Sequence, residues 1–269
     1  MNANRHIDIM GIVNLTDDSY FAESRCPSVE AAMSRVERML SEGADIIDLG
    51  ACSTRPGSHP VGEDEEWRRF ASVLPLIRKE FPDVRISIDT YWASVVEKAY
   101  DLIGPFIVND ISAGEDDPSM LPLVGRLGLE YIAMHKRGDS MSMQNLTDYD
   151  DVVSDVSSYF HDFSKKAREA GIKNWILDPG FGFAKTLEQN YRLLSGLDRL
   201  KGEYEGYVPR ILVGLSRKSM IYRPLGVGPN DVLPATQVLH FAALTKGADI
   251  LRVHDVMCAR QTVTMHGFL

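Results

Sequence analysis

Cysteine is scarce in this chain of 269 residues, and its scarcity excludes two common ways of stabilising a protein. The three cysteines, Cys26, Cys52 and Cys258, are too few and too widely spaced to form a disulfide framework or a zinc site. A chain of this length can bury a large core and fold without such cross-links. Unpaired cysteines are typical of a reducing compartment, so we predict a cytoplasmic location.

Long apolar runs and an excess of positive charge are also missing. No apolar run approaches the roughly 20 residues of a membrane helix, and the N-terminus lacks the pattern of a signal peptide, so we expect no membrane partner. The net charge of −9 argues against nucleic acid as the main partner but permits an anionic substrate, because local charge decides what a site binds. Since no linker or low-complexity tract interrupts the chain, we predict a single domain over residues 1–269.

Short apolar segments alternate with longer segments of helical periodicity along the whole chain. The apolar segments are predicted to be strands over residues 6–14, 44–50, 85–90, 106–111, 130–135, 175–180, 210–216 and 250–255. Strands that are apolar throughout and separated by helices are typical of a parallel sheet. Eight such units in a chain of about this length predict an α/β fold of the (β/α)8 TIM-barrel type. An open doubly wound sheet is the alternative.

A polar side chain stands near the carboxyl end of every predicted strand. These side chains are Asn14, Ser53, Thr54, Arg55, Asp89, Asn109, Asp110, His135, Asp178, Ser216, Arg217, Lys218, Arg252 and His254. In a barrel the carboxyl ends of the strands converge on one mouth, where active sites lie. A single Asp or Asn at a strand end more often caps the next helix, but so many polar strand ends together indicate a binding site.

The basic side chains in this set predict an anionic ligand. Arg55, Lys218, Arg252 and His254 are cationic or can become so. Together with the hydroxyl of Thr54 and nearby backbone amides, they suit a phosphate or pyrophosphate group.

The acidic and amide side chains predict a different part of the same ligand. Asp89, Asn109 and Asp178 offer hydrogen-bond acceptors, and a carboxylate pairs well with a ring that carries adjacent N–H and NH2 donors. Asn14 can offer its amide oxygen to Mg²⁺, which usually binds few protein oxygens together with substrate phosphates. The set therefore predicts a ligand with a guanine-like ring edge and a pyrophosphate tail.

The glycine-rich stretch DPGFGFAKT, residues 178–186, has two possible readings. Glycine-rich loops before a helix can bind phosphate at the helix N-terminus. This stretch lacks the full spacing of the known phosphate-binding loops, so we favour a tight strand-to-helix turn. In such a turn, the Phe183 ring could line the binding site of an aromatic ligand.

Eight motifs taken together resemble the dihydropteroate synthase family. They are MGIVNLTDDSYF, DLGACSTRPGS, ISIDT, VNDISAG, MHKRG, LDPGFGFAKT, VGLSRKS and LRVHD, in that family's order from Met10 to Asp255. The resemblance implies a barrel enzyme of folate biosynthesis, usually a homodimer and a target of sulfonamides. It would join 6-hydroxymethyl-7,8-dihydropterin pyrophosphate to 4-aminobenzoate with Mg²⁺ as cofactor, and release 7,8-dihydropteroate and pyrophosphate.

The resemblance also implies a role for each predicted site residue. The residues implied to bind the pterin are Asp89, Asn109, Asp178 and Lys218, and those implied to bind pyrophosphate are Arg252 and His254. Asn14 would bind Mg²⁺, and Thr54 and Arg55 would belong to the loop over the reacting centre. Ser216, Lys218 and Phe183 would lie near the aminobenzoate. The mechanism implied for the family is dissociative: pyrophosphate leaves, a pterin methylene cation forms, and the arylamine attacks it. Charge stabilisation of the leaving group is the physical basis of such a reaction.

The chain departs from the family pattern chiefly in its first loop. Asp17 stands where the family usually has proline, and the stretch with Ala22 and Glu23 replaces a run of glycine and aspartate. Ala184 replaces the second glycine of the usual GFGK. These departures leave a non-catalytic pterin-binding paralogue as one alternative to the synthase. A second alternative, which would share the acidic ring-binding residues, is a methyltetrahydrofolate-dependent methyltransferase. The methyltransferase would have no need of the basic motifs STRPGS, SRKS and RVHD.

Overall fold

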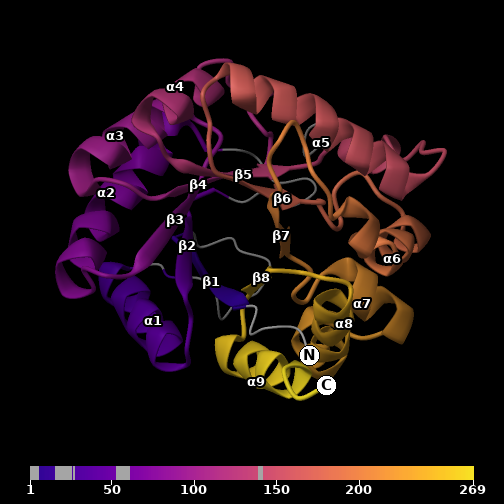
Figure 1. Ribbon diagram of the computed structural model, residues 1–269. Coiled ribbons are helices and arrows are strands. Elements are labelled where there is room, and N and C mark those ends of the chain that lie inside the picture. Colours follow the sequence, from indigo (N-terminus) through magenta and orange to yellow (C-terminus); the bar gives the residue numbers. More distant parts are fainter. Residues whose placement is uncertain (1–5, 16–25, 27, 53–60, 139–141) are drawn as a thin grey trace.

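Eight parallel strands form a closed barrel in chain order in the computed structural model, which describes residues 6–15, 26, 28–52, 61–138 and 142–269 (Figure 1). The strands are β1 (Asp8–Asn14), β2 (Ile46–Gly50), β3 (Arg85–Asp89), β4 (Ile107–Asp110), β5 (Glu130–Met134), β6 (Trp175–Asp178), β7 (Arg210–Val213) and β8 (Ile250–Val253). The last strand pairs with the first, with Asp8 opposite Ile250. The predicted TIM barrel is confirmed, and the open sheet is excluded.

Helices follow the strands and form the outer ring of the barrel (Figure 1). They are α1 (Val29–Ser41), α2 (Glu63–Glu80), α3 (Ala93–Ile103), α4 (Met120–Leu127), α5 (Val152–Glu169), α6 (Leu187–Ser195), α7 (Ser219–Leu225), α8 (Leu233–Thr245) and α9 (Val256–His266), with short 3-10 turns η2 (Met143–Asn145), η3 (Leu197–Leu200) and η4 (Pro229–Asp231). Among the described residues, none of these helices has the length and apolar character that a bilayer crossing requires.

Local signals in the sequence set where α6 begins. Thr186 is its N-cap: the Thr186 side chain accepts a hydrogen bond from the backbone of Gln189, and the Gln189 side chain accepts one from the backbone of Thr186. This reciprocal capping box satisfies two backbone donors that the helix itself cannot satisfy. The helix therefore starts directly after the glycine-rich loop, which places that loop at the barrel mouth.

The barrel interior changes in character from one end to the other. At the amino ends of the strands, Asp8 forms ion pairs of 2.7 Å with both Arg85 and Arg210, and Arg85 also pairs with Glu130. Toward the carboxyl ends comes an apolar cluster of Met10, Ile46, Ile107, Ile132, Ile176, Leu212 and Ile250. Side chains from alternate strands fill a TIM barrel in such layers. The apolar layer separates the ion pairs at the amino ends from the polar mouth.

Candidate active site

Arg252 on β8 is the centre of a polar layer at the carboxyl end of the barrel. Its guanidinium donates to Asp48 and to Asp89, with N–O distances of 2.7 Å to each carboxylate. Asp48 is fully buried and also accepts hydrogen bonds from Ser87 (2.6 Å) and Asn109 (3.2 Å). Four strands, β2, β3, β4 and β8, thus contribute to one hydrogen-bonded network.

The charges of this network depend on one another. Burial raises the pKa of Asp89 to about 7, although Arg252 acts in the opposite direction and Asp48 adds to the rise. Burial works against the charge of Arg252, but the carboxylates of Asp48 and Asp89 outweigh it and raise the pKa of Arg252. The mouth therefore holds a permanent cation between two acids, and Asp89 titrates close to neutral pH.

Asp178 and Lys218 lie beside the glycine-rich loop that follows β6. Asp178 Oδ1 accepts a hydrogen bond from the backbone of Gly180 at 2.8 Å. Lys218 Nζ donates to the carbonyl of Phe181 at 2.6 Å and lies 4.9 Å from the ring centroid of Phe183. Burial lowers the pKa of Lys218 to about 8, with Asp178 opposing the shift. An acid, a cation and an aromatic ring thus border one part of the mouth.

His254 and Ser216 link the ends of β7 and β8. His254 Nδ1 lies 3.0 Å from Ser216 Oγ, which also accepts from the His254 backbone at 3.3 Å. Burial lowers the pKa of His254 to about 3, so the imidazole is neutral near pH 7. His254 therefore serves this site as a hydrogen-bonding group, in contrast to the permanent cation of Arg252.

Asn14 ends β1 beside the same network. A Cβ atom on Gly50 would lie 3.4 Å from Asn14 Oδ1 and 3.9 Å from Asp89 Oδ2. Gly50 therefore lies next to both the amide of Asn14 and the carboxylate of Asp89 and places no side chain against them. Both groups offer oxygen atoms on the mouth side of the barrel.

The structure brings most of the predicted site residues together. Those at the mouth are Asn14, Asp89, Asn109, Asp178, Phe183, Ser216, Lys218, Arg252 and His254. Thr54 and Arg55, which also have predicted roles, lie outside the described residues, as does Ser53. Two other polar strand ends have partners of their own: Asp110 accepts from Tyr131, and Arg217 donates to Asp255. The individual roles predicted for all of these residues stay predictions.

Comparison with known proteins assigns this barrel to a family. Residues 10–254 match the model of the pterin binding enzyme family. The dihydropteroate synthase of Escherichia coli K12 is 38% identical over 253 residues, which are 93% of this chain and 87% of that protein. The chain belongs to the dihydropteroate synthase family.

Solved structures of dihydropteroate synthases match the whole barrel. A Yersinia pestis enzyme in complex with a sulfonamide drug superposes with a TM-score of 0.91 at 35% identity, over 98% of this chain and 94% of that one. The Thermus thermophilus enzyme in complex with 4-aminobenzoate superposes with a TM-score of 0.84 at 35% identity, over 98% of this chain and 95% of that one. Two relatives, from Pneumocystis carinii and Arabidopsis thaliana, are 40% identical, and this chain spans only 34% and 47% of their lengths.

Asp48 is a residue of this synthase-family site to which the sequence analysis gave no role. It pairs with Arg252 and is fully buried, so it fixes the cation at the mouth. A signal was present in the sequence: side chains alternate along a strand, so Asp48 shares its face with Ile46 and Gly50. Since Ile46 belongs to the apolar cluster inside the barrel, that face is the inward one. A lone acid on an inward face requires a partner.

The family implies Mg²⁺ at the mouth, and the residues there fit it. Asn14 offers a neutral amide oxygen at the end of β1, whereas the carboxylate of Asp89 is already paired with Arg252. Mg²⁺ in phosphate-handling sites typically takes one or two protein oxygens, several waters and oxygens of the substrate phosphates. A small set of protein donors is therefore sufficient.

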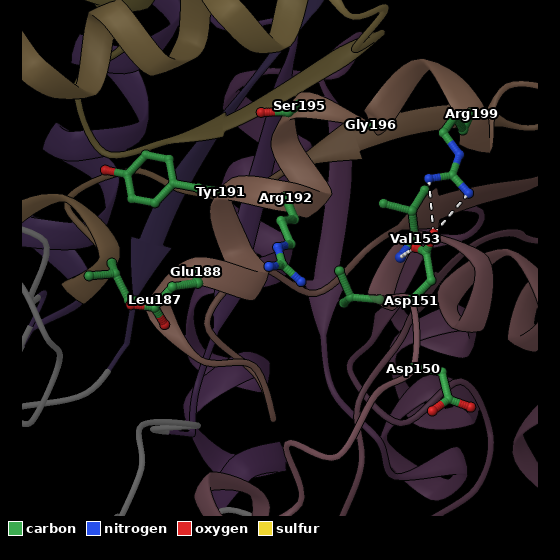
Figure 2. Close-up of a pocket in the computed structure, with 11 residues that line it drawn as sticks. Asp150, Asp151, Val153, Leu187, Glu188, Tyr191, Arg192, Ser195, Gly196 and Arg199 are labelled. Carbon is green, nitrogen blue, oxygen red and sulfur yellow. Dashed lines mark hydrogen bonds and ion pairs between the residues drawn. The ribbon is translucent and has the colours of Figure 1, made fainter.

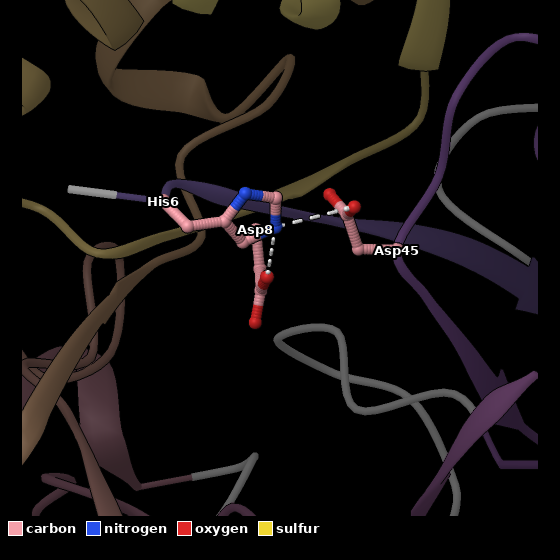
Figure 3. Close-up of side chains that lie close together, drawn as sticks. All are labelled: His6, Asp8 and Asp45. Carbon is pink, nitrogen blue, oxygen red and sulfur yellow. Dashed lines mark ion pairs between the residues drawn. The ribbon is translucent and has the colours of Figure 1, made fainter. Parts of the chain in front are cut away.

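A second group of possible metal ligands does not fit a divalent cation. His6 Nε2 lies 3.0 Å from Asp8 and 3.5 Å from Asp45, at the amino end of the barrel (Figure 3). Asp8 is already paired with Arg85 and Arg210, and an arginine of α9 pairs with Asp45. These guanidinium groups neutralise the carboxylates that a metal would need. The cluster is therefore part of the ion-pair network at the amino ends of the strands.

A surface cleft between the start of α5 and α6 is separate from the mouth (Figure 2). Arg199 pairs there with Asp151, the N-cap of α5, at 3.3 Å. Leu187, Tyr191 and Arg192 of α6 form another part of its lining. None of the predicted site residues within the described part of the chain lines it, so the catalytic site is assigned to the mouth.

Glu66 on α2 is a buried carboxyl that predicts a pH-dependent stability. Its side chain is fully buried, and the nearby Thr90 lowers its pKa by less than burial raises it. Burial raises the pKa of Glu66 from 4.5 to about 7. Because the folded-state pKa lies above the unfolded one, this group favours folding at low pH and loses that contribution as the pH rises from 4.5 toward 7.

Replacing Glu66 by glutamine is therefore expected to stabilise the protein more at high pH than at low pH. The free energy of unfolding of Glu66→Gln relative to wild type should rise by about 3 kcal/mol between about pH 4.5 and about pH 8. Urea unfolding at both values measures it. Glu65→Gln is the control, because Arg68 and Arg69 lower the pKa of the half-buried Glu65 to about 2, so that its protonation hardly changes between these pH values. If the free energy of unfolding of Glu66→Gln differed from that of wild type by the same amount at both pH values, the raised pKa of Glu66 would be contradicted.

Proposed function

We propose that this protein acts as a dihydropteroate synthase in folate biosynthesis, as its named relatives do. The substrates are 6-hydroxymethyl-7,8-dihydropterin pyrophosphate and 4-aminobenzoate, and the products are 7,8-dihydropteroate and pyrophosphate. The observation that carries the proposal is the position of Arg252 between Asp48 and Asp89 at the mouth. An arginine and a lysine beside several buried acceptors suit a ligand that has both a donor-rich ring and an anionic tail.

The ring is recognised by acceptors that lie in a largely dry layer. Asp178 and Asn109 are both buried, and Asp89 is only partly accessible. A pterin carries an NH2 group next to a ring N–H, and a carboxylate accepts from both through parallel hydrogen bonds. Such charge-assisted bonds are strong where water is excluded, so the site prefers a pterin to a ring without these donors.

The anionic tail is held by the groups of β7 and β8. When pyrophosphate leaves, the C–O bond of the pterin methylene breaks and its electron pair remains on the leaving oxygen. Arg252 offers charge and His254 a hydrogen bond to that oxygen, with Lys218 close by. Asn14 would hold Mg²⁺, which would supply further positive charge to stabilise the leaving group. The amine nitrogen of 4-aminobenzoate forms the new C–N bond and then loses a proton.

The aminobenzoate is expected to lie against Phe183 and Ser216. Lys218 lies over the Phe183 ring, so an aromatic ligand there contacts a ring and a cation together. Thr54 and Arg55 are proposed to complete the catalytic set from the loop after β2. The pyrophosphate-binding groups favour this synthase over a methyltetrahydrofolate-dependent methyltransferase, which has no such leaving group.

The activity is tested with purified protein, dihydropterin pyrophosphate, Mg²⁺ and 4-aminobenzoate. We expect pyrophosphate and dihydropteroate to appear together and only when all three additions are present. Omission of the metal tests the proposed cofactor in the same experiment. Tight binding of the pterin pyrophosphate without any product would instead support the non-catalytic paralogue.

We also propose a single domain over residues 1–269, a homodimer and a cytoplasmic location. The support for the dimer is α8, which is apolar on its outer side as well as its inner one. Val238 is 67% exposed there, whereas Ala243 and Leu244 are buried. A second copy of the chain that covers this side would bury Val238. Sedimentation equilibrium of the purified protein distinguishes a dimer from a monomer.

A further inference from the structure

Lys185 is a buried lysine within the glycine-rich loop, and the reaction gives it no task. Its side chain is 4% exposed. Its Nζ atom donates to the carbonyls of Gly180 and Phe183, at 3.0 Å each, and lies 3.0 Å from Nδ1 of His135. These three acceptors match the three N–H donors of an ammonium group. Within the described residues no carboxylate forms an ion pair with it.

The loop is wrapped around this ammonium group. Gly180, Gly182 and Ala184 all have positive φ angles, of 70°, 83° and 49°. Alanine adopts this left-handed conformation only at a cost, so surrounding contacts must hold it there. A Cβ atom on Gly180 would lie 2.0 Å from the carbonyl oxygen of His135, which shows that the loop packs directly on the end of β5. Lys185 is the hydrogen-bonding centre of this turn.

The same turn supplies contacts to the pterin side of the mouth. The carbonyl of Phe181, between the two that bind Lys185, accepts a hydrogen bond from Lys218. The backbone N–H of Gly180 donates to Asp178, and the Phe183 ring lies beneath Lys218. The conformation that Lys185 holds thus fixes one acid, one cation and one ring relative to each other.

The protonation state of His135 agrees with this arrangement. Burial lowers the pKa of His135 to about 2, so the imidazole is neutral and its Nδ1 can accept the hydrogen bond. Burial also lowers the pKa of Lys185 to about 7, although the nearby Asp178 opposes the shift. Neutral acceptors surround Lys185, whereas Asp178 remains available to a ligand.

We propose that Lys185 is a positioning residue for the pterin subsite, which acts by binding the carbonyls of Gly180 and Phe183. It touches no reacting atom in this assignment. Its effect reaches the ligand through Asp178, Phe183 and Lys218. This inference rests on the proposed function, because it assumes that the mouth binds a pterin.

The test compares two ligands on the full chain. Lys185→Met keeps the length of the side chain and removes all its donors. The Kd for 6-hydroxymethylpterin, measured by calorimetry, is expected to rise about tenfold or more. The Kd for inorganic pyrophosphate should change by less than about twofold, because Arg252 lies on β8 and hydrogen-bonds to Asp48 and Asp89, and His254 follows β8 and hydrogen-bonds to Ser216.

Lys136→Met is the matched control. Lys136 is also a buried lysine and follows β5, but its Nζ pairs with Asp116 at 2.6 Å and not with the glycine-rich loop. The control is expected to lose stability while it retains the wild-type Kd for the pterin. It therefore separates the loss of a buried lysine in general from the loss of the carbonyl contacts.

A second pair of variants covers the case in which Lys185→Met does not fold. His135→Gln retains an acceptor for Lys185 and is expected to keep the pterin Kd within about twofold, whereas His135→Leu should raise it about threefold or more. Wild-type protein that does not bind the pterin would refute the proposed function. Wild-type binding together with unchanged pterin affinity in Lys185→Met, or equal losses for pterin and pyrophosphate, would overturn the role of Lys185.

Discussion

Asp178→Asn is expected to abolish measurable binding of a pterin while leaving the fold intact. The wild-type carboxylate can accept two parallel hydrogen bonds from the ring. The amide of asparagine has only one acceptor oxygen, and its NH2 group would face an N–H donor of the ring. Each lost bond to a charged group costs roughly 1.5–3 kcal/mol, so the Kd should rise on the order of a hundredfold or more. Calorimetric titration with 6-hydroxymethylpterin measures the change.

Asp110→Asn is the control for this variant. Asp110 ends β4, is fully buried and accepts from Tyr131 at 2.6 Å and from Ser112 at 2.7 Å. Its side chain points away from the mouth, because it follows Asn109, which faces inward. The control should lose stability and retain pterin affinity. Near-normal affinity in Asp178→Asn would remove Asp178 from the ring subsite.

Arg252→Met is expected to destabilise the protein by about 3–5 kcal/mol, because it leaves the fully buried Asp48 without its cation. The loss should be greater at about pH 8 than at about pH 5. Arg252 lowers the pKa of Asp89, so without the guanidinium the folded-state pKa of Asp89 rises further. A carboxyl group whose folded-state pKa is raised contributes less to stability as the pH increases. Urea unfolding at the two pH values measures the loss in the free energy of unfolding and the direction in which that loss changes with pH.

The double variant Arg252→Met, Asp48→Asn separates the ion pair from other effects of the substitution. Asparagine removes the unpaired charge, so a substantial part of the lost stability should return. No recovery would mean that the packing of the arginine stem, and not its charge, carries the effect.

Arg252→Met also tests the pyrophosphate assignment. Binding of dihydropterin pyrophosphate is expected to weaken more than binding of the bare pterin, because only the former presents an anion to the guanidinium. Parallel titrations of wild type and variant with the two ligands give the increase in Kd for each ligand, and the two increases can then be compared. Equal losses for both would move Arg252 out of the phosphate site.

Much of the fold could be predicted from local patterns. The alternation of apolar strands with helical segments and the length of the chain were sufficient for the barrel, because each pattern reports which side chains are buried. The helix α7 has no recognisable helical pattern in the sequence. It has seven residues with Pro224 inside, which is too short for a periodic signal to emerge.

Most of the site was also predictable, since the carboxyl ends of parallel strands meet wherever a barrel closes. What could not be predicted were the partners inside it. Arg252 and Asp48 lie 204 residues apart in the sequence, and they meet only because β8 pairs with β1 and closes the circle. His254 could be assigned as a possible cation, but its neutrality near pH 7 depends on burial.

The sequence by itself therefore determined the type of fold, the family and the residues that gather at the mouth, because these follow from periodicity and from motifs that are local. Only the tertiary structure decided which charges are paired and which groups are buried. Asp48, Glu66 and Lys185 show this most clearly, since each is an ordinary charged residue in the sequence. Desolvation and partner geometry depend on segments that are distant along the chain, and these two factors set the pKa values and the hydrogen bonds of the site.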